Sequence, residues 1–241
     1  MTGHTQSLGL IGADGRMGRA VAAGAEGRYD IAGRVTLDDP DPASLSDCDV
    51  VIDFSSGPAL TSALAHLRDG TALVSGTTGL SEAEEDAVAD AATRLPILRS
   101  GNFSLGIAVL SSLARQAAAT LGDGWDVDIL EMHHRHKTDA PSGTALMLGD
   151  AVAQGRDVSL EDKAAHDRTG ARRDGDIGFA VLRGGGVYGM HEVRIASESE
   201  MIVLGHQALN RDVFAHGALA AADWLIGRGP GLYSMSDLTG L

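Results

Sequence analysis

Short apolar runs alternate with helical patterns over residues 8–98. Runs such as Leu8–Ile11 and Asp49–Phe54 are rich in Val, Ile and Leu, which is typical of buried parallel strands. Strands that alternate with helices form parallel sheets, so this part predicts a doubly wound, Rossmann-like α/β sheet. The expected strands are 8–11, 29–35, 49–54, 71–74 and 95–98, and the expected helices are 19–25, 59–69 and 81–93.

The pattern changes after residue 103. A long helical stripe is followed by a partly alternating run, a second helix and three more strand-like runs joined by short turns, which favour antiparallel pairing. Residues 155–176 are rich in charge and are expected to form a long surface loop. We therefore predict a second α+β domain on an open mixed sheet. Its expected helices are 104–121 and 142–154, and its expected strands are 125–132, 177–182, 187–196 and 200–206.

The final helical run, 212–226, is expected to return to the first domain because chain termini are often close together. The predicted division is thus 1–103 plus 209–241 for a dinucleotide-binding domain. Residues 104–208 are then expected to form a domain for substrate binding and oligomerisation.

The amino-acid composition and net charge exclude some classes of protein. The 241 residues are 44% hydrophobic but only 4% aromatic, so the core must be aliphatic. A net charge of −14, from 33 acidic and 19 basic residues, argues against a nucleic-acid partner. No run approaches the ~20 apolar residues of a membrane span, and the N-terminus lacks a secretory pattern. We expect a cytoplasmic protein in which the single Cys48 is a buried apolar residue.

A glycine turn, Gly12-Ala-Asp-Gly-Arg-Met-Gly18, lies between the first strand and the first helix. Glycines there let the backbone approach a pyrophosphate, whose charge the helix N-terminus stabilises. Further loops at strand carboxyl ends, where such sheets bind ligands, are 54–56, 76–78 and 100–103. A ribose-binding residue is expected near the end of the second strand. Thr36 or Asp38 fits, with Arg34 nearby, so the preference between NAD and NADP stays open.

The most concentrated chemistry lies in Glu131-Met-His-His-Arg-His-Lys-Thr-Asp-Ala-Pro-Ser-Gly-Thr144, called here the His-rich segment. A histidine can donate a proton at neutral pH, and a lysine can donate one or stabilise developing negative charge. Ser142-Gly-Thr144 begins a helix whose N–H groups suit a carboxylate. The segment therefore predicts a site for a small dicarboxylate with proton donors beside it.

Other interpretations compete with this one. His133, His134 and His136 would suit a metal by residue type, but adjacent histidines on a strand point to opposite faces, so no metal is expected. A cationic surface without a role is a second alternative. The scattered histidines are expected to be surface or packing residues; they are His66, His166, His191, His206 and His216.

The His-rich segment resembles the signature of the 4-hydroxy-tetrahydrodipicolinate (dihydrodipicolinate) reductase family, which acts in the diaminopimelate route to lysine. The turn at 12–18, Ile52-Asp-Phe54, Gly76-Thr-Thr-Gly79 and Asn102-Phe103 match the family in order and spacing. The resemblance implies NADH or NADPH as cofactor, His133 as general acid/base, Lys137 as second proton donor, and a homotetramer. It implies substrate binding by His134, Gly143 and Thr144. The implied cofactor-binding residues are Gly12, Ala13, Asp14, Gly15, Arg16, Met17, Gly76, Thr77, Thr78, Ser100, Gly101, Asn102 and Phe103.

Two features depart from the family pattern: the segment 37–49 is short, and no acidic residue clearly closes the second strand. Two rival functions remain at this stage. One is a dehydrogenase for another amino-dicarboxylate, such as aspartate, which would not need the His-rich segment in this form. The other is a cofactor sensor without turnover, which would not need paired proton donors.

Overall fold

The computed structural model describes residues 5–241, which divide into two compact units. The first runs to Leu105 and resumes over Asp212–Gly240, and the second spans Gly106–Arg211. Residues 1–4, on which part of the expectation about a secretory pattern rests, lie outside the described residues. Among residues 5–241, no helix is long and apolar enough to cross a membrane.

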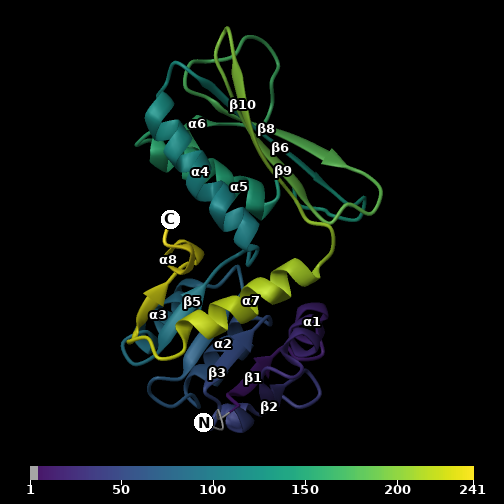
Figure 1. Ribbon diagram of the computed structural model, residues 1–241, viewed down its shortest axis with the longest axis vertical. Coiled ribbons are helices and arrows are strands. Elements are labelled where there is room, and N and C mark those ends of the chain that lie inside the picture. Colours follow the sequence, from purple (N-terminus) through teal and green to yellow (C-terminus); the bar gives the residue numbers. More distant parts are fainter. Residues whose placement is uncertain (1–4) are drawn as a thin grey trace. The chain divides into compact units, whose positions relative to one another are not determined.

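A six-stranded parallel sheet organises the first unit (Figure 1). Its strand order is β11-β5-β4-β3-β1-β2, which confirms the doubly wound prediction. The strands are β1 Ser7–Ile11, β2 Asp30–Val35, β3 Val50–Asp53, β4 Ala72–Ser75, β5 Pro96–Arg99 and β11 Gly231–Tyr233. The helices are α1 Arg16–Ala25, α2 Gly57–Leu64, α3 Glu82–Ala91, α7 Asp212–Leu225 and α8 Met235–Thr239, with a 3₁₀ turn at Pro42–Leu45.

Side chains of α2 and α3 pack on one face of this sheet, where Leu60 and Val88 join Val51 and Leu73 in an aliphatic core. Helix α7 contacts α1 and strands β3 to β5. Cys48 is buried in the same core, as expected of a small apolar residue. Ser81 and Glu84 form the capping box of α3 that their spacing predicts.

A five-stranded mixed sheet organises the second unit, in the order β10-β9-β6-β8-β7 (Figure 1). The strands are β6 Asp126–His133, β7 Ala164–Ala165, β8 Ile177–Arg183, β9 Met190–Ala196 and β10 Met201–Gln207. Helices α4 Leu105–Leu121 and α5 Gly143–Gly155 cover one face, where Ile107, Leu110 and Leu148 pack against Val127 and Ile129. The alternation along β6 sends Glu131 and His133 to this covered face.

The strand pairing differs in one respect from the prediction. The run at 177–183 does not pair with the run that follows it, because β6 lies between β8 and β9. Strand β8 is parallel to β6, whereas β9 is antiparallel to both β6 and β10. The link from β8 to β9 therefore crosses the end of β6, where the N–H of Gly184 donates to the carbonyl of His133 at 2.9 Å.

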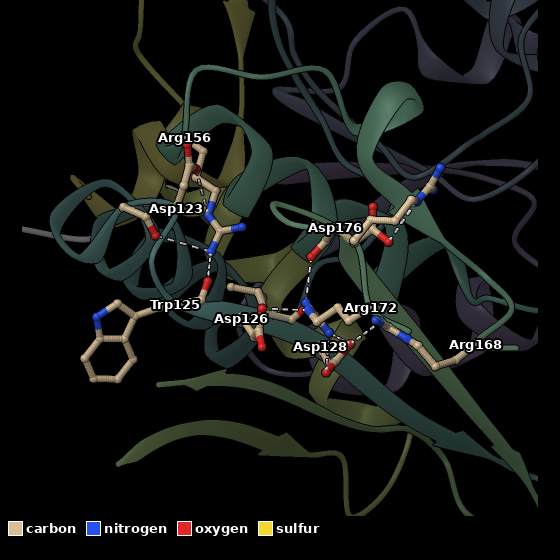
Figure 2. A network of polar contacts seen from close by, with 11 residues as sticks. Asp123, Trp125, Asp126, Asp128, Arg156, Arg168, Arg172 and Asp176 are labelled. Atoms are coloured by element: carbon tan, nitrogen blue, oxygen red, sulfur yellow. Dashed lines mark hydrogen bonds and ion pairs between the residues drawn. The ribbon is translucent and has the colours of Figure 1, made fainter. Parts of the chain in front are cut away.

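The expected long surface loop at 155–176 is exposed over most of 166–175, but regular structure interrupts its first half. The segment contains α6 Leu160–Lys163 and β7, and two of its arginines, Arg168 and Arg172, form ion pairs with the start of β6. Figure 2 shows this network: Arg172 contacts Asp126 at 2.7 Å and Asp128 at 2.9 Å, and donates to the carbonyls of Val127 and Asp176. Its charges look like those of a solvated loop in the sequence, but Arg168 and Arg172 pair with the aspartates of β6.

Smaller differences concern element ends. Helix α1 begins at Arg16 rather than residue 19, α2 ends at Leu64 rather than residue 69, and β9 begins at Met190 rather than residue 187. The sequence prediction also missed β11 and α8, because three residues carry too little periodicity to reveal an edge strand.

Candidate active site

Phe54, directly after β3, joins the three loops predicted to hold a cofactor. A side chain at Gly12, whose φ is +76°, would overlap the Phe54 carbonyl, and one at Gly76 would overlap the Phe54 ring. The Phe54 ring also packs edge-on against Phe103, with centroids 5.5 Å apart. Glycine at 12 and 76 is thus required by close packing, and the loops at 12–17, 76–78 and 100–103 meet in one place.

The turn at 12–18 has the shape of a phosphate cradle. A side chain at Gly18 would overlap the carbonyl of Gly12, so helix and turn approach as closely as backbone allows. Gly15 is the N-cap of α1 and offers no side-chain cap, which leaves the first-turn N–H groups for an anion. This turn therefore fits the pyrophosphate of a dinucleotide.

The predicted cofactor residues differ in what they can offer. Asp14, Gly15, Arg16, Thr78 and Gly101 are exposed, and Gly12, Met17, Gly76, Ser100 and Asn102 are partly exposed. Ala13, Thr77 and Phe103 are buried and support the loops from behind. Asn102 is held by its own loop, because its N–H donates to Ser100 Oγ at 3.1 Å and its Oδ1 accepts from the N–H of Ser104 at 2.8 Å.

A buried carboxylate, Asp53, lies beneath these loops. It accepts from Ser75 Oγ at 2.7 Å and from Ser55 Oγ. Burial raises the pKa of Asp53, while these hydroxyl donors act in the opposite direction. The N–H of Ser55 donates in turn to Thr77 Oγ1 at 3.1 Å. Asp53 therefore fixes the loops after β3 and β4 relative to each other.

The residues directly after β2 form a hydrogen-bonded turn. The Thr36 N–H donates to the Asp39 carbonyl, and the Asp39 N–H donates to Thr36 Oγ1, both at 2.9 Å. Asp38 is exposed in this turn. The Val35 carbonyl accepts from the N–H groups of Gly12 and Ala13, which places this turn beside the phosphate cradle.

His133 is buried at the end of β6 and is bound to Glu131. Its Nδ1 lies 2.6 Å from Glu131 Oε2, and the Arg183 guanidinium binds both carboxylate oxygens of Glu131, at 2.7 and 2.8 Å. Burial lowers the pKa of His133, and the hydrogen bond to Glu131 opposes that change. Burial tends to raise the pKa of Glu131, but hydrogen bonds from Arg183 and His133 outweigh it and lower the value.

The start of α5 is attached to the same carboxylate. The Ser142 N–H donates to Glu131 Oε1 at 2.9 Å, and Ser142 Oγ caps the helix by accepting from the Ala145 N–H. Gly143 and Thr144 form the first turn, with open space beside Gly143. Lys137 Nζ lies 2.7 Å from Asp139, and the charge of Lys137 acts on His133 to lower its pKa. The predicted residues His133, Lys137, Gly143 and Thr144 thus all lie at or between the end of β6 and the start of α5.

Two histidines expected to be surface or packing residues lie on β9 and β10, the two strands on one side of β6. His191 on β9 is paired with Glu131 in the sheet register, and His206 on β10 is paired with His191. The rings of His191 and His133 pack edge-on, 5.1 Å apart, and His191 Nε2 lies 3.3 Å from Ser142 Oγ. Burial lowers the pKa of His191 to about 4, so it is neutral at neutral pH. Only the strand order reveals this proximity, and the sequence does not show that order.

The remaining histidines of the segment, His134 and His136, lie directly after β6. His134, partly exposed, packs near His136 with ring centroids 6.2 Å apart. Over residues 5–241 no group of three or more His, Cys, Asp or Glu side chains is arranged to hold a metal ion.

A dinucleotide cradle on a doubly wound sheet, with a buried histidine and a helix N-terminus on a second sheet, defines a nicotinamide-dependent oxidoreductase. Family models for the N-terminus and C-terminus of dihydrodipicolinate reductase match residues 6–103 and 106–239. The chain belongs to the dihydrodipicolinate reductase family, an oxidoreductase family that uses NADH or NADPH.

Individual relatives agree over the full length. The chain is 47% identical to 4-hydroxy-tetrahydrodipicolinate reductase of Caulobacter vibrioides, over 97% of this chain and 96% of the relative. It is also 47% identical to the enzyme of that name from Zymomonas mobilis, over 97% of each chain. Among solved structures, the dipicolinate-bound dihydrodipicolinate reductase of Paenisporosarcina sp. TG-14 has the same fold, with a TM-score of 0.76 at 22% identity over 96% of this chain and 98% of that one.

Proposed function

We propose that the chain catalyses the NAD(P)H-dependent reduction of 4-hydroxy-tetrahydrodipicolinate to tetrahydrodipicolinate, with loss of the hydroxyl as water, in the diaminopimelate pathway to lysine. The observation that supports it most is the joint attachment of His133 and the N-terminus of α5 to Glu131. This arrangement sets a proton donor beside an anion-binding turn, as a dicarboxylate substrate requires.

Bound NADH or NADPH supplies the hydride. The cradle at Gly12–Met17 would hold its pyrophosphate, and the loops at 76–78 and 100–103 would hold the nicotinamide half. His133 donates the proton that balances the hydride, from Nε2, because Nδ1 is engaged by Glu131. Lys137 is the second proton donor and stabilises negative charge on the ring. His134 and the N–H groups of Gly143 and Thr144 bind the substrate carboxylates.

Turnover with substitution of the two proton donors tests the proposal. His133→Ala and Lys137→Ala should each lower kcat by about 10²- to 10⁴-fold, the contribution of a positioned acid, while KM for the nicotinamide cofactor changes little. The measurement is the loss of reduced-nicotinamide absorbance with substrate present. His66→Ala, at an exposed histidine of the first unit, is the matched control and should keep full turnover.

Near-normal turnover by both variants would refute the assigned roles. Cofactor binding without any consumption by the unaltered chain would favour a sensor instead. Turnover on aspartate rather than on the tetrahydrodipicolinate precursor would favour the related dehydrogenase. Comparing kcat/KM for NADH and NADPH on the same preparation measures the cofactor preference.

We further propose that the chain assembles as a homotetramer in the cytoplasm, through the face of the second sheet that α4 and α5 leave open. Large apolar side chains are exposed on that face, among them Leu182, Met201 and Val203. Such a surface is typical of an interface between protomers. Light scattering should give a tetramer for the unaltered chain and smaller species for Val203→Glu. If the unaltered chain remained monomeric at micromolar concentration, the proposed tetramer would be refuted.

A further inference from the structure

Glu131 takes no chemical step in the proposed reaction, yet His133, Ser142 and Arg183 are all hydrogen-bonded to it. Its side chain is 1% exposed and accepts four hydrogen bonds. One comes from His133 Nδ1, one from the Ser142 N–H, and two from the Arg183 guanidinium. A buried carboxylate is costly unless it is paired and fully hydrogen-bonded, and this one is.

The contact with His133 decides which ring nitrogen reacts. An ionised carboxylate only accepts hydrogen bonds, so Nδ1 of His133 must carry a proton in both charge states of the ring. The proton that is gained and given up is therefore on Nε2. A side chain at Gly189 would come within 3.2 Å of that Nε2, so glycine at 189 keeps the space beside it open.

The other contacts of the pair fix the substrate side. The Ser142 N–H binds Glu131 Oε1, and Arg183 Nη2 also donates to the Asp139 carbonyl at 2.6 Å. Both ends of the loop between His133 and α5 are thus attached to one ion pair. The loop carries Lys137, and α5 begins with Gly143 and Thr144.

We propose that Glu131 and Arg183 are positioning residues for this reaction: Glu131 holds the His133 ring and the N-terminus of α5 in one geometry, and Arg183 balances its charge. The inference rests on the proposed function. Neither residue donates the proton to the substrate. Their joint effect is to fix the distance between the proton donor and the carboxylate-binding turn, a distance to which reaction rates are sensitive.

The pair should also set the charge state of His133. Glu131 raises its pKa, whereas Arg183 from β8 and Lys137 from the following loop lower it. His191, which faces it from β9, is neutral at neutral pH. A general acid works only while protonated, so the rate falls as pH rises through its pKa. Loss of the Glu131 charge should move this fall to lower pH, and loss of the Arg183 charge should move it to higher pH.

The test compares Glu131→Gln and Arg183→Met with the unaltered enzyme, by pH profiles of kcat/KM. We expect the descending limb to move by about one pH unit in opposite directions in the two variants. For Glu131→Gln we also expect kcat to fall at least tenfold. Asp223→Asn on α7 is the control: its carboxylate binds Arg28 at 2.6 Å in the first unit, and its profile should not move.

A purely structural role would lower the amount of active enzyme without shifting the two pH profiles in opposite directions. The proposal would be overturned if the descending limbs did not move, or if both moved in the same direction. If Glu131→Gln does not fold, Arg183→Met decides alone, with the His133 titration followed by NMR on labelled histidine. Failure of the proposed function is separate: it would appear as no turnover by the unaltered enzyme, or as full turnover by His133→Ala.

Discussion

Strand β6 carries an arginine–carboxylate cluster at each end, and the two differ in burial and in what they hold. At its start, Asp126 and Asp128 bind Arg172 on the side of the strand away from the helices, and the Asp128 side chain is 48% exposed. At its end, Glu131 binds Arg183 on the covered side and is 1% exposed. The first cluster attaches a chain segment, whereas the second binds His133, the proposed proton donor.

Solvent explains the difference. In the outer cluster water screens each charge, and Arg172 has alternative acceptors in the carbonyls of Val127 and Asp176. Loss of one contact there leaves the others in place. In the inner cluster the Glu131 carboxylate is 1% exposed, and both His133 Nδ1 and the Ser142 N–H depend on it, whereas Arg183 also donates to the carbonyls of Leu182 and Asp139. We therefore expect the same chemical pair to be replaceable at one end of β6 and indispensable at the other.

The largest expected effect is that of Glu131→Ala. It leaves the Arg183 charge without its carboxylate partner and the Ser142 N–H without its acceptor, and we expect a loss of about 3–5 kcal/mol in the free energy of unfolding, with turnover abolished. Urea denaturation and the turnover assay measure the two effects. Glu192→Ala, at a partly exposed carboxylate on β9, should cost less than about 1 kcal/mol. Equal losses of unfolding free energy in the two variants would show that burial of the carboxylate does not determine the cost of removing it.

Gly178→Ala tests the outer cluster by crowding it. A side chain at Gly178 on β8 would overlap Asp128 Oδ1 and the Arg168 guanidinium, so both must move. We expect a loss of about 1–2 kcal/mol and faster proteolysis within 166–176, with kcat unchanged. Gly205→Ala on β10 is the control, because its nearest contact would be an ordinary 3.6 Å to Glu192. A fall in kcat for Gly178→Ala would show that the outer cluster also affects the reaction.

Gly189→Ala tests the inner cluster by the same means. The added methyl group would lie 3.2 Å from His133 Nε2, and Glu131 restrains the ring from turning away. We expect kcat to fall about tenfold, less than the hundredfold that a 1 Å displacement can cost, with little change in stability. Steady-state kinetics and urea denaturation measure these. An unchanged kcat would mean that the proton does not leave from Nε2.

The comparison also shows what periodicity in the sequence can reveal. Aliphatic runs such as those at 49–54 and 71–74 predicted the parallel sheet because both faces of such strands, here β3 and β4, are buried. The concentration of His and Lys in the His-rich segment singled out its residues because they are adjacent in the chain. Their roles stay predictions, as do those of the cofactor residues.

What the sequence concealed depends on contacts between distant segments. His191 and Glu131 are neighbours only because β9 pairs with β6, and the short link from β8 favoured a different pairing. The arginines at 168 and 172 resembled a solvated loop because the aspartates that bind them lie about forty residues earlier, on β6. Neither relation leaves a periodic pattern that composition or spacing could reveal.

The smallest expected effect is that of Asp128→Asn. Arg172 would keep Asp126 at 2.7 Å and its two backbone carbonyls, and the lost charge is half exposed. We expect the free energy of unfolding to fall by less than about 1 kcal/mol, and the difference to shrink at high salt because surface ion pairs are screened. Urea denaturation at low and high NaCl measures both. A loss near that of Glu131→Ala, independent of salt, would mean that the outer cluster is as indispensable as the inner one, and that burial does not decide between them.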